Sequence, residues 1–336
     1  MYAAIDFGIS NTDAVAYRDG EWQRWTRPSE GRPDSDLVRA VLAAGGIELA
    51  GKSQKDPSLE VGMNGKAGDL GAAVPKGFSL RKPRRFAPGS FTSLQRLAIT
   101  GGQHKLLPER IEGCPLVAVN EVTAIGRGGQ ALAGLAAADD APLLVVSAGS
   151  GTAVVAAQGD AYAHVTGTAV GGGTLLGLSR LLLHTVDHDE IDALARQGDP
   201  NGADLSLADV VTGPIGNLPA DATAANFGRL ARDDIAVSRE DLAAALVTMV
   251  GQTIALVAIN AARAQAAERG LDAVRIVVIG HLIDMVSMRS VVERVGELYG
   301  VPIVLPTDSG YGTALGALLH AADAPLSYAP AEGMKR

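Results

Sequence analysis

The chain has 336 residues and a formal net charge of -8; apolar side chains occupy 47 % of its positions and aromatic ones only 4 %. This length predicts two lobes of roughly 100 to 200 residues each, with a cleft between them. We place the lobes at residues 1–138 and 139–336. The acidic balance argues against nucleic acid or an anionic membrane as a main partner, because either would favour clustered Lys and Arg.

Cysteine content and hydropathy indicate where the protein works. Cys114 is the single cysteine, so an intrachain disulfide and a four-cysteine metal site are both excluded. The first residues show no basic segment followed by an apolar stretch, and we find no later run of about 18 uncharged apolar residues. We therefore expect a cytoplasmic protein that does not insert into membranes. The basic run at residues 81–85 fits a solvated loop better than an anion site.

Hydrophobic patterning predicts the same strand, polar turn, strand unit twice in the chain. The first unit has strands at residues 2–5 and 14–17, and the second has strands at residues 143–146 and 153–157. The repetition, about 140 residues apart, suggests two lobes of related design.

The other predicted elements alternate between strands and helices. Residues 20–96 have weak periodicity, so we expect an elaborated loop region there with one helix at residues 36–44. Further strands are expected at residues 96–100, 117–119, 275–279 and 303–305, and further helices at residues 123–137, 174–184, 240–268, 288–299 and 312–321. Such alternation implies an α/β architecture with helices packed on sheets.

The two polar turns carry residue types that bind phosphate. The first offers backbone N–H groups, hydroxyls and one carboxylate through Asp6, Gly8, Ser10, Asn11 and Thr12, and the second contributes Gly149, Ser150, Gly151 and Thr152. The Asp6 carboxylate can hold Mg²⁺, directly or through water. Two facing turns would clamp a phosphate, although either turn alone would also suit an ordinary hairpin.

A run of glycines gives the strongest local signal. In the segment VTGTAVGGGTLLGL at residues 165–178, Gly171, Gly172 and Gly173 lead through Thr174 into an apolar helix. Glycine permits close backbone approach, and a helix N-terminus favours anions. We predict that a nucleotide lies across this turn, with a purely structural hinge as the alternative.

Around this helix the sequence resembles the type II pantothenate kinases, whose pattern is RVTGT followed by GGGTFLGL. The resemblance is strongest over residues 142–230, where LADV, LP and the segment 224–228 are similar to the family's DIYGG, GLP and ASSFG. It extends over about residues 1–18 and 97–320. It implies a two-lobed actin-like ATPase (ribonuclease H-like) fold, an ATP cleft between the lobes, ATP and Mg²⁺ as cofactors, a small-molecule substrate and a homodimer.

The resemblance also implies roles for individual residues. Glu121 falls where the family has a general base, which would accept the proton of the substrate hydroxyl; a Glu favoured by the helix dipole is the alternative. Gly280, followed by His281 where the family has a glycine–asparagine turn, and Gly310 would border the nucleotide. The acceptor pocket would include Gly102, Asn120, His164 and Thr166.

Several positions depart from the family pattern. His164 stands in place of Arg, Asn120 in place of Asp, and Ala153 in place of Ser, all in the implied acceptor pocket. Arg is a fixed bidentate cation and His is not, so this exchange alters what an acceptor meets. Asp13 stands where the family has Lys, in a string that resembles hydantoinase-type ATPases. His104 and Lys105, next to Gly101 and Gly102, could either add cations to the pocket or lie on the surface.

The departures leave three functions to compare. The first is a kinase for pantothenate or for a different hydroxylated substrate. The second is a nucleotide-binding pseudokinase or regulator, against which the retention of Glu121 speaks. The third, an ATP-driven activator of radical dehydratases, is disfavoured because its bridging iron–sulfur cluster needs more than one cysteine from each subunit.

Overall fold

The structure is a computed structural model that describes residues 1–49, 94–136, 138–211, 213–232 and 234–322. The basic run at residues 81–85 and much of the loop region expected over residues 20–96 lie outside these residues. Within the described part of that region the expectation of loops is wrong, because Glu21–Pro28 forms a complete strand, β3. It pairs with β2 along its whole length and buries Gln23 and Trp25 on one face.

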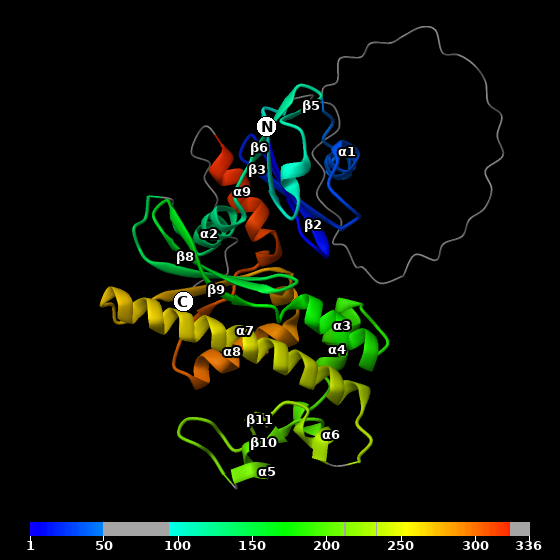
Figure 1. The fold of residues 1–336 in the computed structure, drawn as a ribbon, viewed down its shortest axis with the longest axis vertical. Coiled ribbons are helices and arrows are strands. Elements are labelled where there is room, and N and C mark those ends of the chain that lie inside the picture. Colours follow the sequence, from blue (N-terminus) through cyan, green and yellow to red (C-terminus); the bar gives the residue numbers. More distant parts are fainter. Residues whose placement is uncertain (50–93, 137, 212, 233, 323–336) are drawn as a thin grey trace, which may run out of the picture.

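The described residues of the first lobe form a six-stranded sheet in the order β3-β2-β1-β4-β6-β5, at the top of Figure 1. Its strands are β1 (Tyr2–Phe7), β2 (Asn11–Arg18), β3, β4 (Arg96–Gly101), β5 (Arg110–Ile111) and β6 (Cys114–Ala118). The 3-10 turn η1 (His104–Leu106) and helix α1 (Ser35–Ala44) accompany them. The register places Asp6, near the end of β1, opposite Asp13 on β2 and Thr100 on β4.

The described residues of the second lobe contain a five-stranded sheet in the order β13-β12-β7-β8-β9. Its strands are β7 (Leu143–Ala148), β8 (Thr152–Gln158), β9 (Ala161–Thr168), β12 (Arg275–Ile279) and β13 (Ile303–Val304). The predicted strand, turn, strand units are therefore present in both lobes. Strand β9 was not predicted, because it is an edge strand whose residues are exposed or half-buried and show no apolar period.

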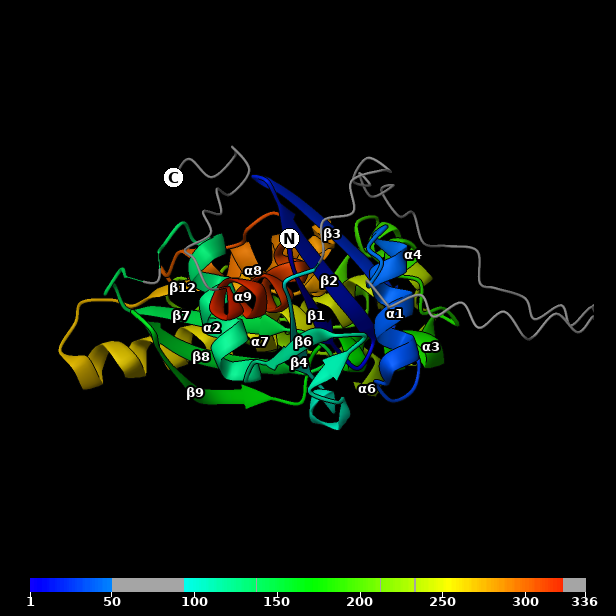
Figure 2. The ribbon, with the colours of Figure 1, turned by 90° about the horizontal axis from the view of Figure 1, so that it is seen from above.

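Two helices connect the lobes, and Figures 1 and 2 both show them side by side. Helix α9 (Gly312–Ala321) packs its Ala314 and Leu318 on the first sheet, and helix α2 (Glu121–Leu132) packs its Ile125 on the second. A Cβ on Gly316 would lie only 1.9 Å from the Ala124 carbonyl oxygen, so the crossing requires glycine. Helix α2 ends before the predicted residue 137, since Gly134 has a φ of 76°.

The second sheet is covered by helices on its outer face, below it in Figure 1. These are α3 (Gly172–Leu182), α4 (His188–Ala195), α7 (Arg239–Arg269) and α8 (Val286–Leu298). The 3-10 turns η3 (His281–Asp284) and η4 (Ser309–Tyr311) follow β12 and β13. Ser238 caps α7 by accepting a hydrogen bond from the Asp241 N–H, and Gly270 ends it at a φ of 64°. Both ends agree with the prediction to within one residue.

Helix α7 shows that the expected absence of a long uncharged apolar run was wrong. By length and composition it could cross a membrane, since an 18-residue window within it has a mean hydropathy of 2.1. However, 67 % of that window is buried inside the protein, with Ile254 and Ile259 fully enclosed. The helix therefore forms the core of the second lobe, as core helices of soluble folds do.

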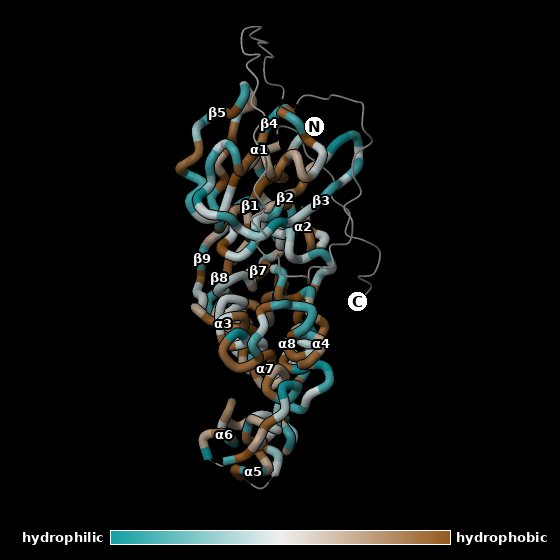
Figure 3. Tube along the Cα trace, turned by 90° about the vertical axis from the view of Figure 1, so that its right-hand side faces the viewer, coloured by the Kyte–Doolittle hydropathy of each residue, from teal (hydrophilic) through white to brown (hydrophobic). Residues whose placement is uncertain are grey.

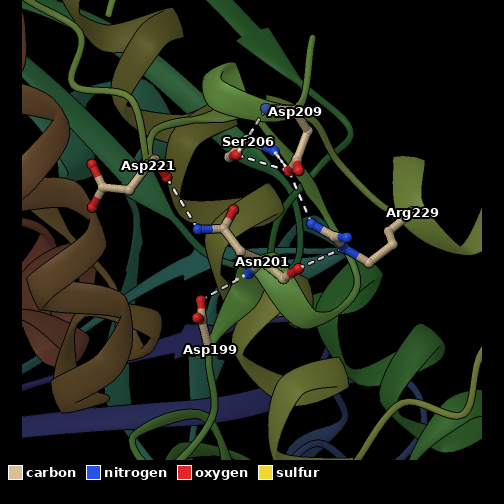
Figure 4. Close-up of polar contacts among 6 residues, drawn as sticks. All are labelled: Asp199, Asn201, Ser206, Asp209, Asp221 and Arg229. Atoms are coloured by element: carbon tan, nitrogen blue, oxygen red, sulfur yellow. Dashed lines mark hydrogen bonds and ion pairs between the residues drawn. The ribbon is translucent and has the colours of Figure 1, made fainter. Parts of the chain in front are cut away.

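Residues 200–232 form a small segment beyond α7, at the lower end of the molecule in Figure 3. Its elements are η2 (Pro200–Gly202), β10 (Leu205–Ser206), α5 (Leu207–Val211), β11 (Thr223–Ala225) and α6 (Gly228–Arg232). Hydrogen bonds hold it together (Figure 4): the Asp209 carboxylate accepts from the Ser206 hydroxyl at 2.7 Å and from Arg229 at 2.9 Å, and Arg229 also donates to the Asn201 carbonyl. Buried Asp204 accepts from the Phe227 N–H at 2.7 Å.

Candidate active site

The two predicted phosphate turns lie against each other between the lobes. The Ser10 hydroxyl, from the turn between β1 and β2, is 3.0 Å from the Ser150 hydroxyl, from the turn between β7 and β8. These residues are 140 positions apart in the sequence. The structure thus brings together the two groups of residues that the sequence assigned to phosphate binding.

Asp6 lies at the centre of a group of carboxylates. Burial, together with the negative charges of Asp13 and Glu121, raises the pKa of Asp6 to about 8, although the nearby His281 opposes the rise. Carboxylate and hydroxyl oxygens are the ligands that Mg²⁺ prefers. The described residues contain no group of three or more His, Cys, Asp or Glu that could hold a metal ion unaided. The Asp6 carboxylate and the hydroxyls of the first turn therefore fit a Mg²⁺ ion that keeps waters or phosphate oxygens among its ligands.

Gly101 shapes the space beside Asp6. It has a φ of 83°, and a Cβ there would lie 2.3 Å from Asp6 Oδ1. The next N–H, that of Gly102, donates to the Phe7 carbonyl at 2.8 Å. His104 is buried, with Nδ1 2.6 Å from the Gly101 carbonyl oxygen, so it supports this turn from beneath and is not a surface residue. The sequence had singled out Gly102 but had not assigned Gly101.

The glycine run packs directly on the second phosphate turn. The N–H of Gly172 donates to the Gly149 carbonyl at 2.8 Å, and the N–H of Gly173 donates to the Ser150 carbonyl at 2.9 Å. A Cβ on Gly171 would meet both carbonyl oxygens within 2.9 Å. The run therefore holds the turn in place, which is a structural role. Contact between a nucleotide and this run, including Thr174, stays a prediction.

Two further turns support the second phosphate turn. Gly280 has a φ of 117°, and a Cβ there would lie 2.3 Å from the Ala148 carbonyl oxygen. Its N–H donates to the Ser309 carbonyl at 3.0 Å. Gly310 packs against the His281 ring, where a Cβ would lie 2.2 Å from Nδ1. The two glycines predicted to border the nucleotide thus lie close to each other.

The candidate acceptor residues come from both lobes. Asn120 caps α2, because its side-chain oxygen accepts from the Val122 N–H at 2.9 Å. Glu121 is exposed at the first position of the helix, close enough to influence Asp6. His164 and Thr166 lie on β9, opposite Val155 and Val154 of β8, and His164 is exposed.

Contacts across the lobes near Asp6 were missed by the sequence analysis. His281 Nε2 is 2.9 Å from Asp13 Oδ1, and Arg24 Nη2 is 2.6 Å from Asp308 Oδ1. Burial alone would lower the pKa of His281, but the Asp13 and Asp284 carboxylates outweigh it and raise the pKa to about 10. The only available signal was that Asp13 and His281 both depart from the family pattern.

The two sheets, the crossing helices and the facing turns define the fold of the actin-like ATPases and sugar kinases. Two solved structures share the fold over 95 % of this chain. One is the activator of 2-hydroxyisocaproyl-CoA dehydratase from Clostridium difficile (TM-score 0.52, 13 % identity, 93 % of that chain). The other is component A of (R)-2-hydroxyglutaryl-CoA dehydratase from Acidaminococcus fermentans (TM-score 0.52, 15 % identity, 96 % of that chain). At these identities the likeness concerns the fold alone.

Sequence relatives give the family. The Fumble family model matches residues 130–319. Type II pantothenate kinase from Oceanobacillus iheyensis is 30 % identical over 226 residues, which is 66 % of this chain and 80 % of that protein. Type II pantothenate kinase from Bacillus cereus (strain G9842) is 27 % identical over 230 residues, 68 % of this chain and 82 % of that protein. The chain belongs to the Fumble family and is an ATP-dependent kinase by class, which confirms the resemblance.

Proposed function

We propose that the protein transfers the γ-phosphoryl group of ATP to a hydroxyl of pantothenate or a closely related acceptor. The observation that carries the proposal is the contact between the two phosphate turns at Ser10 and Ser150, with Asp6 and Glu121 beside it. Phosphoryl transfer depends mainly on positioning and on neutralising charge, and two facing turns provide the first. The relatives named type II pantothenate kinase supply the acceptor class.

Each group in the site has a role in this proposal. ATP supplies the phosphoryl group and Mg²⁺ neutralises its negative charge. Asp6 would hold the metal, directly or through water, and the N–H and hydroxyl groups of the two turns would orient the phosphates. Glu121 is exposed at the start of α2, where it can accept the proton of an incoming hydroxyl.

Asn120 and His164 define what the acceptor meets. Relative to the family pattern, Asn120 removes a negative charge and His164 replaces a fixed cation by a smaller ring. Thr166 would offer the acceptor a hydroxyl group, and Gly102, which has no side chain, would leave room for the acceptor beside the backbone. We therefore expect an acceptor related to pantothenate whose recognition relies less on a carboxylate–Arg ion pair.

The test is ADP release from ATP and Mg²⁺ with pantothenate, pantetheine, pantoate and small sugar acids as acceptors. Glu121→Gln should lose about 10²- to 10⁴-fold in turnover, the usual contribution of a general base. Glu293→Gln, at an exposed position of α8, is the matched control and should keep full turnover. Thermal stabilisation by ATP without acceptor-dependent ADP release would instead favour the pseudokinase.

The oligomeric state and the compartment belong to the same proposal. The small segment exposes several apolar side chains, among them Val210, Ile215 and Leu230 at 55, 51 and 37 %. Apolar side chains gathered on one segment suit burial in a homodimer. A monomer in gel filtration with light scattering at micromolar concentration would contradict the dimer, and recovery in a membrane fraction would contradict cytoplasmic placement.

A further inference from the structure

Two departures from the family pattern contact each other across the lobes. Asp13 lies on β2, where the family has Lys, and His281 follows β12, where the family has Asn. His281 Nε2 is 2.9 Å from Asp13 Oδ1, although the residues are 268 positions apart. Neither exchange can be interpreted alone, because each supplies the partner of the other.

The pair is enclosed and held from behind. Asp13 is only 6 % exposed, and the His281 ring also contacts Asp284, with Nδ1 3.0 Å from Oδ2. Gly310 leaves room for the ring, and the Tyr311 ring packs edge-on at a centroid distance of 5.4 Å. With a pKa of about 10, His281 is protonated at neutral pH, so the contact is an ion pair between a cation and two carboxylates.

A second ion pair crosses the lobes nearby. Arg24 on β3 contacts Asp308 at 2.6 Å, and its guanidinium lies 5.8 Å from the centre of the Tyr311 ring. Its side chain is 49 % exposed, so this pair is screened by solvent and contributes less than the enclosed one. Both pairs contact the Tyr311 ring, which the His281 ring meets edge-on and the Arg24 guanidinium faces.

The position of the pair connects it to both turns. Asp13 comes directly after Asn11 and Thr12 of the first turn, so the side chain that His281 holds belongs to the same strand. His281 follows Gly280, whose backbone packs on the Ala148 carbonyl just before the second turn. Any movement of Asp13 relative to His281 would therefore be transmitted, over only a few residues in each lobe, to the contact between Ser10 and Ser150.

We propose that Asp13 and His281 form a positioning pair that holds the two phosphate turns at the separation needed for phosphoryl transfer. The inference rests on the proposed kinase function and deepens it. His281 also supplies a cation beside Asp6, where the family's Lys is missing, since its charge acts on that carboxyl. The pair binds no acceptor; it acts through the turns.

Exchange of the two residues tests the proposal. We expect His281→Asn and Asp13→Lys each to lower kcat/KM for ATP about 10- to 100-fold, because a displacement of about 1 Å can cost that much. The double variant, which restores the family's Lys and Asn together, should return to within about fivefold of the wild type. Arg39→Gln, which removes an ion pair with Glu112 inside the first lobe, should leave kcat/KM unchanged.

Two readouts separate positioning from simple loss of structure. ATP affinity, measured by calorimetry with Mg²⁺ and no acceptor, tests the pair even if no acceptor in the panel is phosphorylated. Spin labels on Glu109→Cys and Glu293→Cys, in a Cys114→Ala background, report the distance between the lobes. Without ATP, that distance distribution should be broader in His281→Asn than in the labelled protein that keeps the pair.

Opposite results would overturn the proposal. Single variants with wild-type ATP affinity, turnover and distances between the lobes would show that the pair does not position the turns. A double variant that loses the sum of the two single losses would show that Asp13 and His281 act independently. If Asp13→Lys does not fold, Asp13→Ala, which removes the hydrogen-bonding group, replaces it in the same cycle, and retention of full ATP affinity there would equally refute the pairing.

Discussion

A single methyl group beside Asp6 would reveal how tightly the first phosphate turn is built. Gly101 has a φ of 83°, and a Cβ there would lie 2.3 Å from Asp6 Oδ1 and 2.7 Å from the Phe7 carbonyl oxygen. A left-handed backbone costs an L residue about 1–2 kcal/mol, and overpacking adds about 1–3 kcal/mol. We expect Gly101→Ala to lower the free energy of unfolding by about 2–5 kcal/mol.

Gly113 provides the matched control for this variant. Its φ of 81° is nearly the same, but a Cβ there would have no other heavy atom within 4 Å. Gly113→Ala should therefore lose only the backbone contribution of about 1–2 kcal/mol. Urea unfolding measures both losses, and ADP release should fall at least about tenfold in Gly101→Ala alone, because Asp6 must move. Equal losses of stability with equal turnover would refute the placement of Asp6 against Gly101.

Three further predictions concern other parts of the site. Stabilisation by protonated His281 is complete below its ordinary pKa of 6.5 and is lost as the pH rises through about 10. In urea unfolding, the difference in unfolding free energy between wild type and His281→Asn should therefore shrink by on the order of 4 kcal/mol between about pH 6.5 and 10.5, and a constant difference would contradict this. Gly171→Ala should lower both the free energy of unfolding and the affinity for ATP, because its Cβ would lie 2.8 Å from the Ser150 carbonyl oxygen. Gly177→Ala, in open space on the same helix, is the control and should raise the free energy of unfolding by up to about 1 kcal/mol. Asn120→Asp should change stability by less than about 0.5 kcal/mol but shift acceptor preference in the ADP-release panel, and unchanged preference would remove Asn120 from the acceptor pocket.

The strand, turn, strand units could be predicted because local chemistry determines them. In β1 and β7 the buried runs Ala3 to Ile5 and Leu143 to Val146 come within two residues of the strand ends at Phe7 and Ala148, and turns rich in glycine and small polar residues follow. The bounds of helix α7 could be predicted equally well, because Ser238 and Gly270 mark its two ends. In each case the signal lies within a few residues of the feature it predicts.

Features that depend on tertiary contacts could not be predicted. Strand β9 has exposed positions because it is an edge strand, and the small segment is held by the hydrogen bonds of Asp209 and Arg229 more than by an apolar core. The pairing of Asp13 with His281 joins two lobes, and no local pattern encodes how two lobes approach each other. The packing role of Gly171 was likewise visible only once the second turn was in place.

The departures from the family pattern fall into two groups with different physical consequences. Asn caps a helix about as well as Asp, so Asn120 serves α2 without needing a charge. His164 is exposed on β9, where the fold makes little demand on its side chain. Under the proposed function, these exchanges would therefore act on an acceptor that approaches Glu121 from solvent. Asp13 and His281 are enclosed and contact each other, so they act on the protein itself. The exchanges at the proposed acceptor positions thus lie apart from the enclosed pair, so an altered acceptor is compatible with the facing turns at Ser10 and Ser150.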